Sequence, residues 1–219
     1  MGSPRQFDFL REELQGECDV LTPWLPGHGG NALDFARSGM KEWEKAAEDA
    51  LRDAFGRYEQ VILLGHSMGG LLLTDACKAF PKALGLICVA MPLRIHYMPY
   101  AAFNALKVAL TAIPCKAREM CGVKTSPFLA SFLWLPRYLE LFRKARRVRK
   151  HLNGLSLPMQ CFYFKKDELC AFASIRDLPK GIPVDICPHS RHSEWTEETC
   201  HRIADAVRRM IERGNSNDL

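Results

Sequence analysis

The chain has 219 residues, of which 47% are hydrophobic and 25% are charged, and its formal net charge is +5. This length favours one large domain with a buried core. No apolar run is long enough for a transmembrane helix, and the first ten residues show no secretory signal. A strongly basic nucleic-acid-binding protein is not indicated, and no nucleic-acid partner is expected.

The first ninety residues alternate between amphipathic stretches and short apolar runs. The spacing of Phe7, Leu10 and Leu14 is helical, whereas short continuous apolar runs are typical of buried parallel strands. In chain order, the pattern predicts a helix over Arg5–Leu14, a strand over Asp19–Leu21, a turn over Pro26–Gly30, a helix over Glu42–Phe55, a strand over Val61–Leu64, a helix over Leu71–Phe80 and a strand over Leu86–Ala90.

The pattern changes after Leu93, and no strand is evident before about Leu155. This aromatic, basic stretch indicates helices. The alternation then resumes with strands over Met159–Phe164 and Pro183–Cys187 and a helix over Glu194–Glu212. Alternating strands and helices predict an α/β fold with a mostly parallel sheet flanked by helices. We therefore expect a core in two parts, 1–92 and 156–219, with an inserted helical cap over 93–155.

The pentapeptide Gly65-His66-Ser67-Met68-Gly69 has the Gly-x-Ser-x-Gly pattern, and it lies between a predicted strand and a predicted helix. That context is typical of a nucleophile elbow, in which a tight turn presents the serine hydroxyl above the sheet. Side chains at the two glycine positions are expected to clash with the neighbouring strand or helix. The backbone N–H of Met68 is the expected oxyanion donor.

A serine nucleophile needs a base and an acid that orients the base, in the chain order Ser, Asp or Glu, His. Asp167 and His192 follow the last two predicted strands, at the carboxyl edge of the sheet. They are the expected acid and base, with Glu168 and His189 as the alternatives. His28 and His66 fit the loop and the elbow better than the base, and His96, His151 and His201 are expected on the surface or in the cap.

These residues resemble the α/β-hydrolase superfamily, in the branch of carboxylesterases and monoacylglycerol lipases with a small helical cap. The resemblance rests on four segments outside the cap, and it implies the same roles for Ser67, Asp167 and His192. The segments are Leu25-Pro26-Gly27-His28-Gly29, Gly65-His66-Ser67-Met68-Gly69-Gly70, Lys166-Asp167-Glu168 and Ser190-Arg191-His192.

The resemblance also implies strands before the first helix, the last of them ending in a His-Gly-x-x-Gly-Ser loop. Here Gly2-Ser3 matches only the tail of that loop. We expect the N-terminal strands and one oxyanion donor to be missing, with two sheet edges exposed. Three explanations compete: the start codon is assigned to an internal methionine, the chain is truncated, or Met1-Gly2-Ser3 is a cloning remnant. We favour the first.

The expected function is hydrolysis of a carboxylic ester through an acyl-enzyme on Ser67, without a metal or organic cofactor. Apolar residues of the cap, from Phe128 to Leu135, form either a slot for an acyl chain or ordinary helix packing. An acyltransferase or amidase with the same three residues remains an alternative. A catalytically impaired fragment that acts only as a binding protein is another.

Two further features bear on location and partners. Six of the eight residues from Arg143 to Lys150 are basic, which indicates a solvated helix face, with a peripheral contact with anionic lipid or nucleic acid as the alternative. The nine cysteines include no Cys-x-x-Cys pair and no metal-ligand pattern with histidine, so a reducing cytoplasm is expected. A reactive cysteine is the alternative reading of the same residues.

Overall fold

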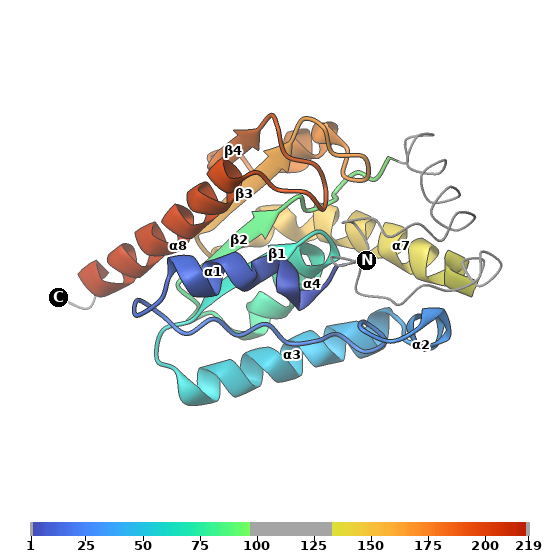
Figure 1. Cartoon of the computed structure of the whole chain (residues 1–219), viewed down its shortest axis with the longest axis horizontal. Helices are drawn as coiled ribbons and strands as arrows, with labels where there is room; N and C mark the ends of the chain where they lie inside the picture. The colour runs from blue at the N-terminus through green and yellow to red at the C-terminus, as the bar shows by residue number, and fades with distance from the viewer. Residues whose placement is uncertain (1, 97–132, 218–219) are drawn as a thin grey trace.

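The computed structural model describes residues 2–96 and 133–217, and a four-stranded parallel sheet lies at its centre (Figure 1). The strands lie side by side in chain order, each parallel to the next. Parallel neighbours require crossover connections, which helices supply here. The predicted α/β class with a parallel sheet flanked by helices is confirmed. The strands are β1 (Ile62–His66), β2 (Gly85–Val89), β3 (Met159–Phe164) and β4 (Val184–Cys187).

Helices cover both faces of the sheet. On one face α4 contacts β1, and α3 and α7 pack against α4. On the other face α1 contacts α8, and Figure 1 shows these two helices in front of the sheet with α7 behind it. The helices are α1 (Asp8–Glu13), α2 (Ala32–Arg37), α3 (Met40–Arg57), α4 (Met68–Ala76), α7 (Leu135–His151) and α8 (Glu197–Asn217), with 3-10 turns η1 (Pro4–Phe7), η2 (Cys77–Ala79), η4 (Leu152–Gly154) and η5 (Phe172–Asp177).

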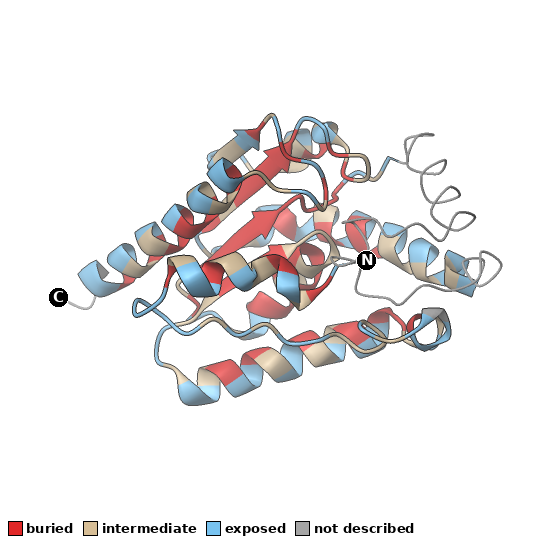
Figure 2. Ribbon diagram, in the orientation of Figure 1, coloured by how far each residue is buried: buried red, intermediate tan, exposed pale blue. Residues whose placement is uncertain are grey.

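The main apolar core lies along β2 and β3, the two inner strands of the described sheet (Figure 2). All five residues of β2 are buried, as expected for a parallel strand covered on both faces. Cys88 and Cys161 are register partners on these strands, and both are fully buried. In this setting a thiol packs as a small hydrophobic group.

Most predicted elements coincide with observed ones to within a few residues, but the strand predicted over Asp19–Leu21 is wrong. This segment is not part of the sheet, because no described residue provides a backbone ladder for it. Val20 packs against the core, Leu21 is exposed, and the Tyr58 hydroxyl donates a hydrogen bond to Asp19 over 2.8 Å. Helix α2 was not predicted, although Asn31 and Asp34 form a capping box at its start.

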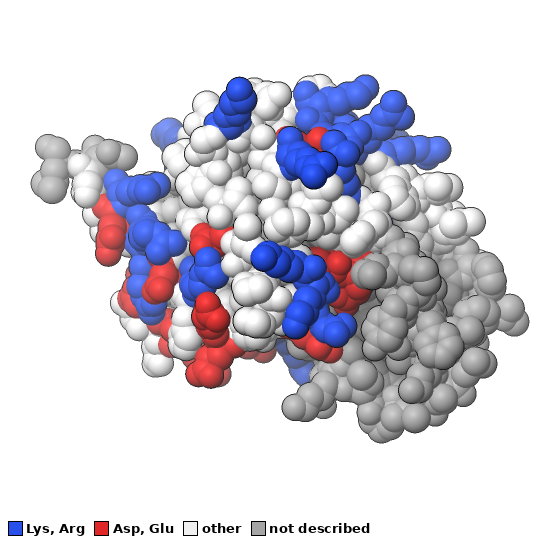
Figure 3. Space-filling model, turned by 90° about the horizontal axis from the view of Figure 1, so that it is seen from above, with Lys and Arg blue, Asp and Glu red and all other residues white. Residues whose placement is uncertain are grey.

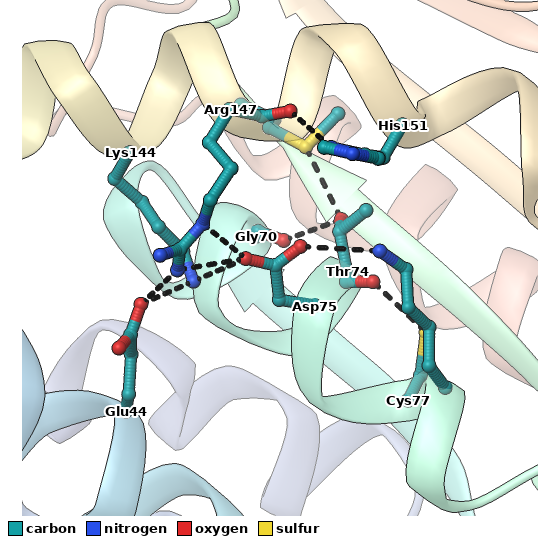
Figure 4. Close-up of polar contacts among 10 residues, drawn as sticks. Glu44, Gly70, Thr74, Asp75, Cys77, Lys144, Arg147 and His151 are labelled. Carbon is teal, nitrogen blue, oxygen red and sulfur yellow. Dashed lines mark hydrogen bonds and ion pairs between the residues drawn. The ribbon is translucent and has the colours of Figure 1, made fainter.

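Helix α7 is held to α3 and α4 by a cluster of ion pairs (Figure 4). The Lys144 ammonium lies 2.8 Å from Glu44 Oε1 and 2.7 Å from Asp75 Oδ2, and its side chain is only 1% exposed. Arg147 pairs with the same two carboxylates. Burial alone would raise the pKa of both carboxyls, but the bonds and charges of Lys144 and Arg147 outweigh it and lower both pKa values.

Replacing Lys144 with methionine is expected to lower the free energy of unfolding by about 1–2 kcal/mol at pH 7, because two partly exposed carboxylates then keep only Arg147 as a counter-ion. Since the carboxyl pKa values are lowered in the folded state, this stabilisation is full above about pH 4 and is lost as the pH falls through the folded values. Urea unfolding of both proteins at several pH values measures the difference. Lys150→Met, at an exposed position, is the matched control. A difference that stayed constant down to pH 3 would contradict the pairing.

No helix in the described ranges 2–96 and 133–217 is long and apolar enough to cross a membrane. The expected boundaries at 93 and 155 stay predictions, since residues 97–132 are not described.

Candidate active site

The turn between β1 and α4 holds Ser67 in a strained backbone conformation. Its φ of 52° and ψ of −120° lie in a region that residues with a side chain rarely adopt. The Ser67 N–H donates a hydrogen bond to Val89 O over 2.8 Å, and Ser67 O accepts one from Gly70 N over 3.0 Å. Strain of this kind persists where surrounding contacts enforce it, and it occurs mainly at functional sites.

The two glycines of the pentapeptide have different roles. A Cβ at Gly65 would lie 2.6 Å from the backbone of Gly69 and Gly70, so no side chain fits there. The expectation of a similar clash at Gly69 is wrong, because a Cβ there meets nothing within 4 Å. The second close approach involves Gly70, where a Cβ would lie 3.2 Å from Met91. Tight packing between β1 and α4 therefore depends on Gly65 and Gly70.

A continuous hydrogen-bond chain joins the three residues selected from the sequence. His192 Nε2 lies 2.9 Å from Ser67 Oγ. His192 Nδ1 lies 2.9 Å from Asp167 Oδ2 and 3.0 Å from Asp167 Oδ1. His192 is 5% exposed and Asp167 4% exposed, so the pair is almost completely sheltered from water. In this arrangement, the neutral imidazole donates a hydrogen bond from Nδ1 to the carboxylate and can accept the hydroxyl proton at Nε2.

Both partners of Ser67 are fixed by their own loops. Asp167 follows β3, and its Oδ1 accepts hydrogen bonds from Leu169 N over 2.8 Å and from Cys170 N over 2.7 Å. His192 follows β4, and its carbonyl accepts a hydrogen bond from Trp195 Nε1 over 3.2 Å. Backbone donors hold the carboxylate and an indole holds the histidine loop, which limits the movement of either side chain.

The alternative acid and base lie elsewhere in the same loops. Among the described residues, Glu168 Oε2 accepts a hydrogen bond only from the backbone N–H of His192, over 3.4 Å, and none from the imidazole. His189 is exposed and has no described hydrogen bond to Ser67 or Asp167. His96, expected on the surface or in the cap, is exposed, and its Nε2 lies 3.1 Å from Asp167 O.

The His66 ring packs against the rings of both His192 and Trp195. The His66 ring centroid lies 4.8 Å from that of His192 and 5.2 Å from that of Trp195. Burial, and then the neighbouring His192, holds the pKa of His66 well below its usual value, so this ring is neutral at pH 7. The sequence pattern did not single out Trp195, although an aromatic residue three positions after the candidate base was a usable signal.

Two of the described cysteines, Cys77 and Cys170, do not have the properties of nucleophiles. Burial raises the pKa of Cys77 to about 11 and raises that of Cys170 further. A nucleophilic cysteine is expected instead to have a lowered pKa and an accessible sulfur. This contradicts the reactive-cysteine alternative for these two residues. Within the described ranges, no group of three or more His, Cys, Asp and Glu side chains could hold a metal ion.

The expected oxyanion donor, the backbone N–H of Met68, lies at the start of a helix. Met68 is the first residue of α4, where the backbone N–H has no acceptor within the helix and is available to an anion.

Of the apolar cap stretch, Phe128 and Phe132 lie outside the described residues. Trp134 packs edge-on against Phe35 with ring centroids 5.6 Å apart. This contact favours ordinary packing for Trp134.

Comparison with known proteins agrees with the fold. A structure reported for the metagenome-derived lipolytic enzymes LipS and LipT has a TM-score of 0.75 and 20% identity, covering 97% of this chain and 89% of that chain. The monoacylglycerol lipase of Paleococcus ferrophilus has a TM-score of 0.61 and 19% identity, covering 94% and 90%. A thermophilic esterase from Thermogutta terrifontis has a TM-score of 0.61 and 21% identity, covering 97% and 86%. At these identities the likeness shows a shared fold.

A search of curated proteins found no match. A sequence model described as the alpha/beta hydrolase family matches residues 2–213, which is nearly the whole chain. The chain belongs to the alpha/beta hydrolase family.

Proposed function

We propose that this protein is a serine hydrolase that cleaves carboxylic esters, as carboxylesterases and monoacylglycerol lipases do, through an acyl-enzyme on Ser67. One observation carries the proposal: the hydrogen-bond chain from Ser67 Oγ through His192 to the Asp167 carboxylate, with distances of 2.9 to 3.0 Å. The strained turn at Ser67 and the family membership support it.

In the acylation step, Ser67 Oγ forms a bond to the ester carbonyl carbon while its proton moves to His192 Nε2. The Met68 N–H donates a hydrogen bond to the carbonyl oxygen as it becomes an oxyanion. Asp167 stabilises the imidazolium and holds its orientation. The bond from carbon to the leaving alkoxide then breaks, and His192 returns the proton to that oxygen, which releases the alcohol.

In the deacylation step, water replaces the alcohol. His192 Nε2 accepts a proton from water as the water oxygen bonds to the acyl carbon. The bond to Ser67 Oγ breaks, the hydroxyl recovers its proton from His192, and the carboxylic acid leaves. Neutral His66 suits this cycle, because a second cation beside His192 would oppose formation of the imidazolium.

An ester with an apolar acyl chain is the proposed substrate. The neighbours described as lipolytic enzymes, a monoacylglycerol lipase and an esterase favour this class. In the proposed organisation, the cap over 93–155 begins just after β2, at the sheet edge where Ser67 lies. A cap that starts there is well placed to contribute to substrate binding.

A panel of aryl esters with graded acyl lengths, combined with a fluorophosphonate that labels activated serines, tests the proposal. We expect hydrolysis with an optimum acyl length, loss of activity in proportion to labelling, and an adduct on the peptide that contains Ser67. Complete labelling of another residue, or complete labelling of Ser67 without loss of hydrolysis, would rule out the mechanism.

A further inference from the structure

Exposed apolar side chains are concentrated at one end of α7. Five of the ten exposed large hydrophobic residues in the described ranges fall within the ten residues from Leu133 to Phe142. Leu135 is 59% exposed, and Leu139 and Phe142 are each 48% exposed. These three side chains follow one another at spacings of four and three, so they share one face of the helix. A contiguous apolar face on a surface marks an interaction site, whereas a single exposed leucine does not.

The opposite face of α7 is fixed to the body of the protein, so the apolar face cannot turn inward. Lys144 is buried between two carboxylates, and Val148 is fully buried in the main core. Near the start of the helix, Glu140 Oε2 accepts the backbone N–H of Met40 over 2.9 Å at the beginning of α3. Leu141 packs against the second apolar cluster, which lies beside α3 and α4. The exposed residues are therefore held outward by a rigid helix.

The side of α7 that carries these exposed residues, here called its outer face, is basic in the second half of the helix. Arg143, Arg146 and Lys150 continue from Leu139 at spacings of four, three and four, and all three are exposed. None of the three has an ion-pair partner among the described residues, in contrast to Lys144 and Arg147. Figure 3 shows that Lys and Arg side chains gather at the upper right of that view, while Asp and Glu side chains lie mainly in the lower half.

We propose that the outer face of α7 binds an anionic lipid surface. Leu135, Leu139 and Phe142 enter the boundary between headgroups and acyl chains, and Arg143, Arg146 and Lys150 contact lipid phosphates. The combination of a rigid apolar end and a cationic stretch matches the two layers of such a surface. The exposed leucines and phenylalanine favour lipid over nucleic acid, which would engage the basic half alone.

A second copy of the chain fits this face less well than lipid does. Antiparallel pairing of two α7 helices would place the basic half of each against the apolar half of the other. Parallel pairing would place Arg146 and Lys150 opposite the same residues of the other copy, and like charges repel. An anionic lipid surface offers acyl chains to the apolar half of this face and phosphates to its basic half.

Lipid binding has a consequence for catalysis that rests on the proposed function. Leu141 of α7 belongs to the same apolar cluster as Met68, which directly follows Ser67. A lipid surface bound by α7 would therefore be a source of apolar esters for the proposed reaction.

Co-sedimentation with vesicles tests the proposal. We expect wild type to bind vesicles of phosphatidylcholine mixed with phosphatidylglycerol, and to bind less as salt increases. Arg146→Glu with Lys150→Glu is expected to weaken partitioning at least about tenfold. Leu139→Ser with Phe142→Ser is expected to weaken it on both mixed and pure phosphatidylcholine vesicles. Lys82→Glu with Ile186→Ser, at exposed positions outside α7, is the matched control and should bind as wild type does.

Absence of wild-type binding, or equal binding by all variants, would overturn the proposal. Sedimentation that revealed a dimer dissociated by Phe142→Ser would assign the face to a second copy instead. Hydrolysis of a soluble aryl ester in lipid-free buffer is expected to be unchanged in every variant. Loss of lipid binding and failure of the ester-hydrolase proposal are therefore separate results.

Discussion

Replacement of Ser67 by alanine is expected to lower kcat for a short-chain aryl ester by about a millionfold, leaving only the slow reaction supported by the rest of the site. The alanine removes the oxygen that bonds to the acyl carbon, while His192 and Asp167 remain 2.9 Å apart and keep their loops. Because no other nucleophile lies within hydrogen-bonding distance of His192 Nε2 among the described residues, no substitute is available. Steady-state hydrolysis of purified wild type and variant measures the loss.

Stability measurements separate loss of chemistry from loss of fold. Ser67→Ala retains a side chain at a φ of 52°, so its free energy of unfolding should be close to that of wild type. Ser67→Gly removes the strain and is expected to be more stable by about 1 kcal/mol while being equally inactive. Ser156→Ala, at an exposed serine, is the matched control and should retain full activity. Comparable activity in wild type and Ser67→Ala would exclude Ser67 as the nucleophile.

Replacement of Asp167 by asparagine is expected to lower kcat/KM by about 10⁴ with little effect on the fold. The asparagine oxygen can still accept the N–H groups of Leu169 and Cys170, so the loop keeps its shape. Its amide NH₂ then faces His192 Nδ1 and donates to it. This favours the tautomer with a hydrogen on Nε2, which cannot accept the Ser67 proton. Hydrolysis rates of an aryl ester at neutral pH provide the measurement.

Glu168→Gln is the matched control for this experiment, because it changes the neighbouring carboxyl in the same way. Among the described residues, the only hydrogen bond to Glu168 comes from the backbone N–H of His192, so the expected change in kcat/KM is less than about tenfold. If Glu168→Gln instead caused the larger loss, the roles of the two acids would be reversed. A similar fluorophosphonate labelling rate in Asp167→Asn and wild type would also contradict the assignment, since labelling requires the same activated hydroxyl.

The parts of the site that the sequence predicts are those determined locally. Gly65 lies near the end of a short apolar strand and Ser67 directly between that strand and a helix, and the chemistry of a tight turn follows from that context. Asp167 and His192 follow predicted strands, and parallel strands bring their carboxyl ends to one edge of a sheet. Local patterns are therefore enough to indicate these three side chains.

Features that depend on distant parts of the chain were not predictable in the same way. The pairs of Lys144 with Glu44 and Asp75 span 100 and 69 residues, and no local spacing links them. The prediction for Asp19–Leu21 failed for a related reason, because an extended apolar segment becomes a strand only when a neighbouring backbone pairs with it. Its composition contains no information about that neighbour.

The placement of α1 and α8 on one face of the sheet has a consequence for the order of events during synthesis. Helix α1 begins at Asp8 and α8 begins at Glu197, yet they pack together, and Arg208 bonds to both Glu13 and Glu17. At synthesis rates of about 5–20 residues per second, on the order of ten to forty seconds separate the emergence of the two helices from the ribosome. Until α8 arrives, α1 and this face of the sheet lack their covering helix, so their apolar side chains stay exposed to solvent over that interval.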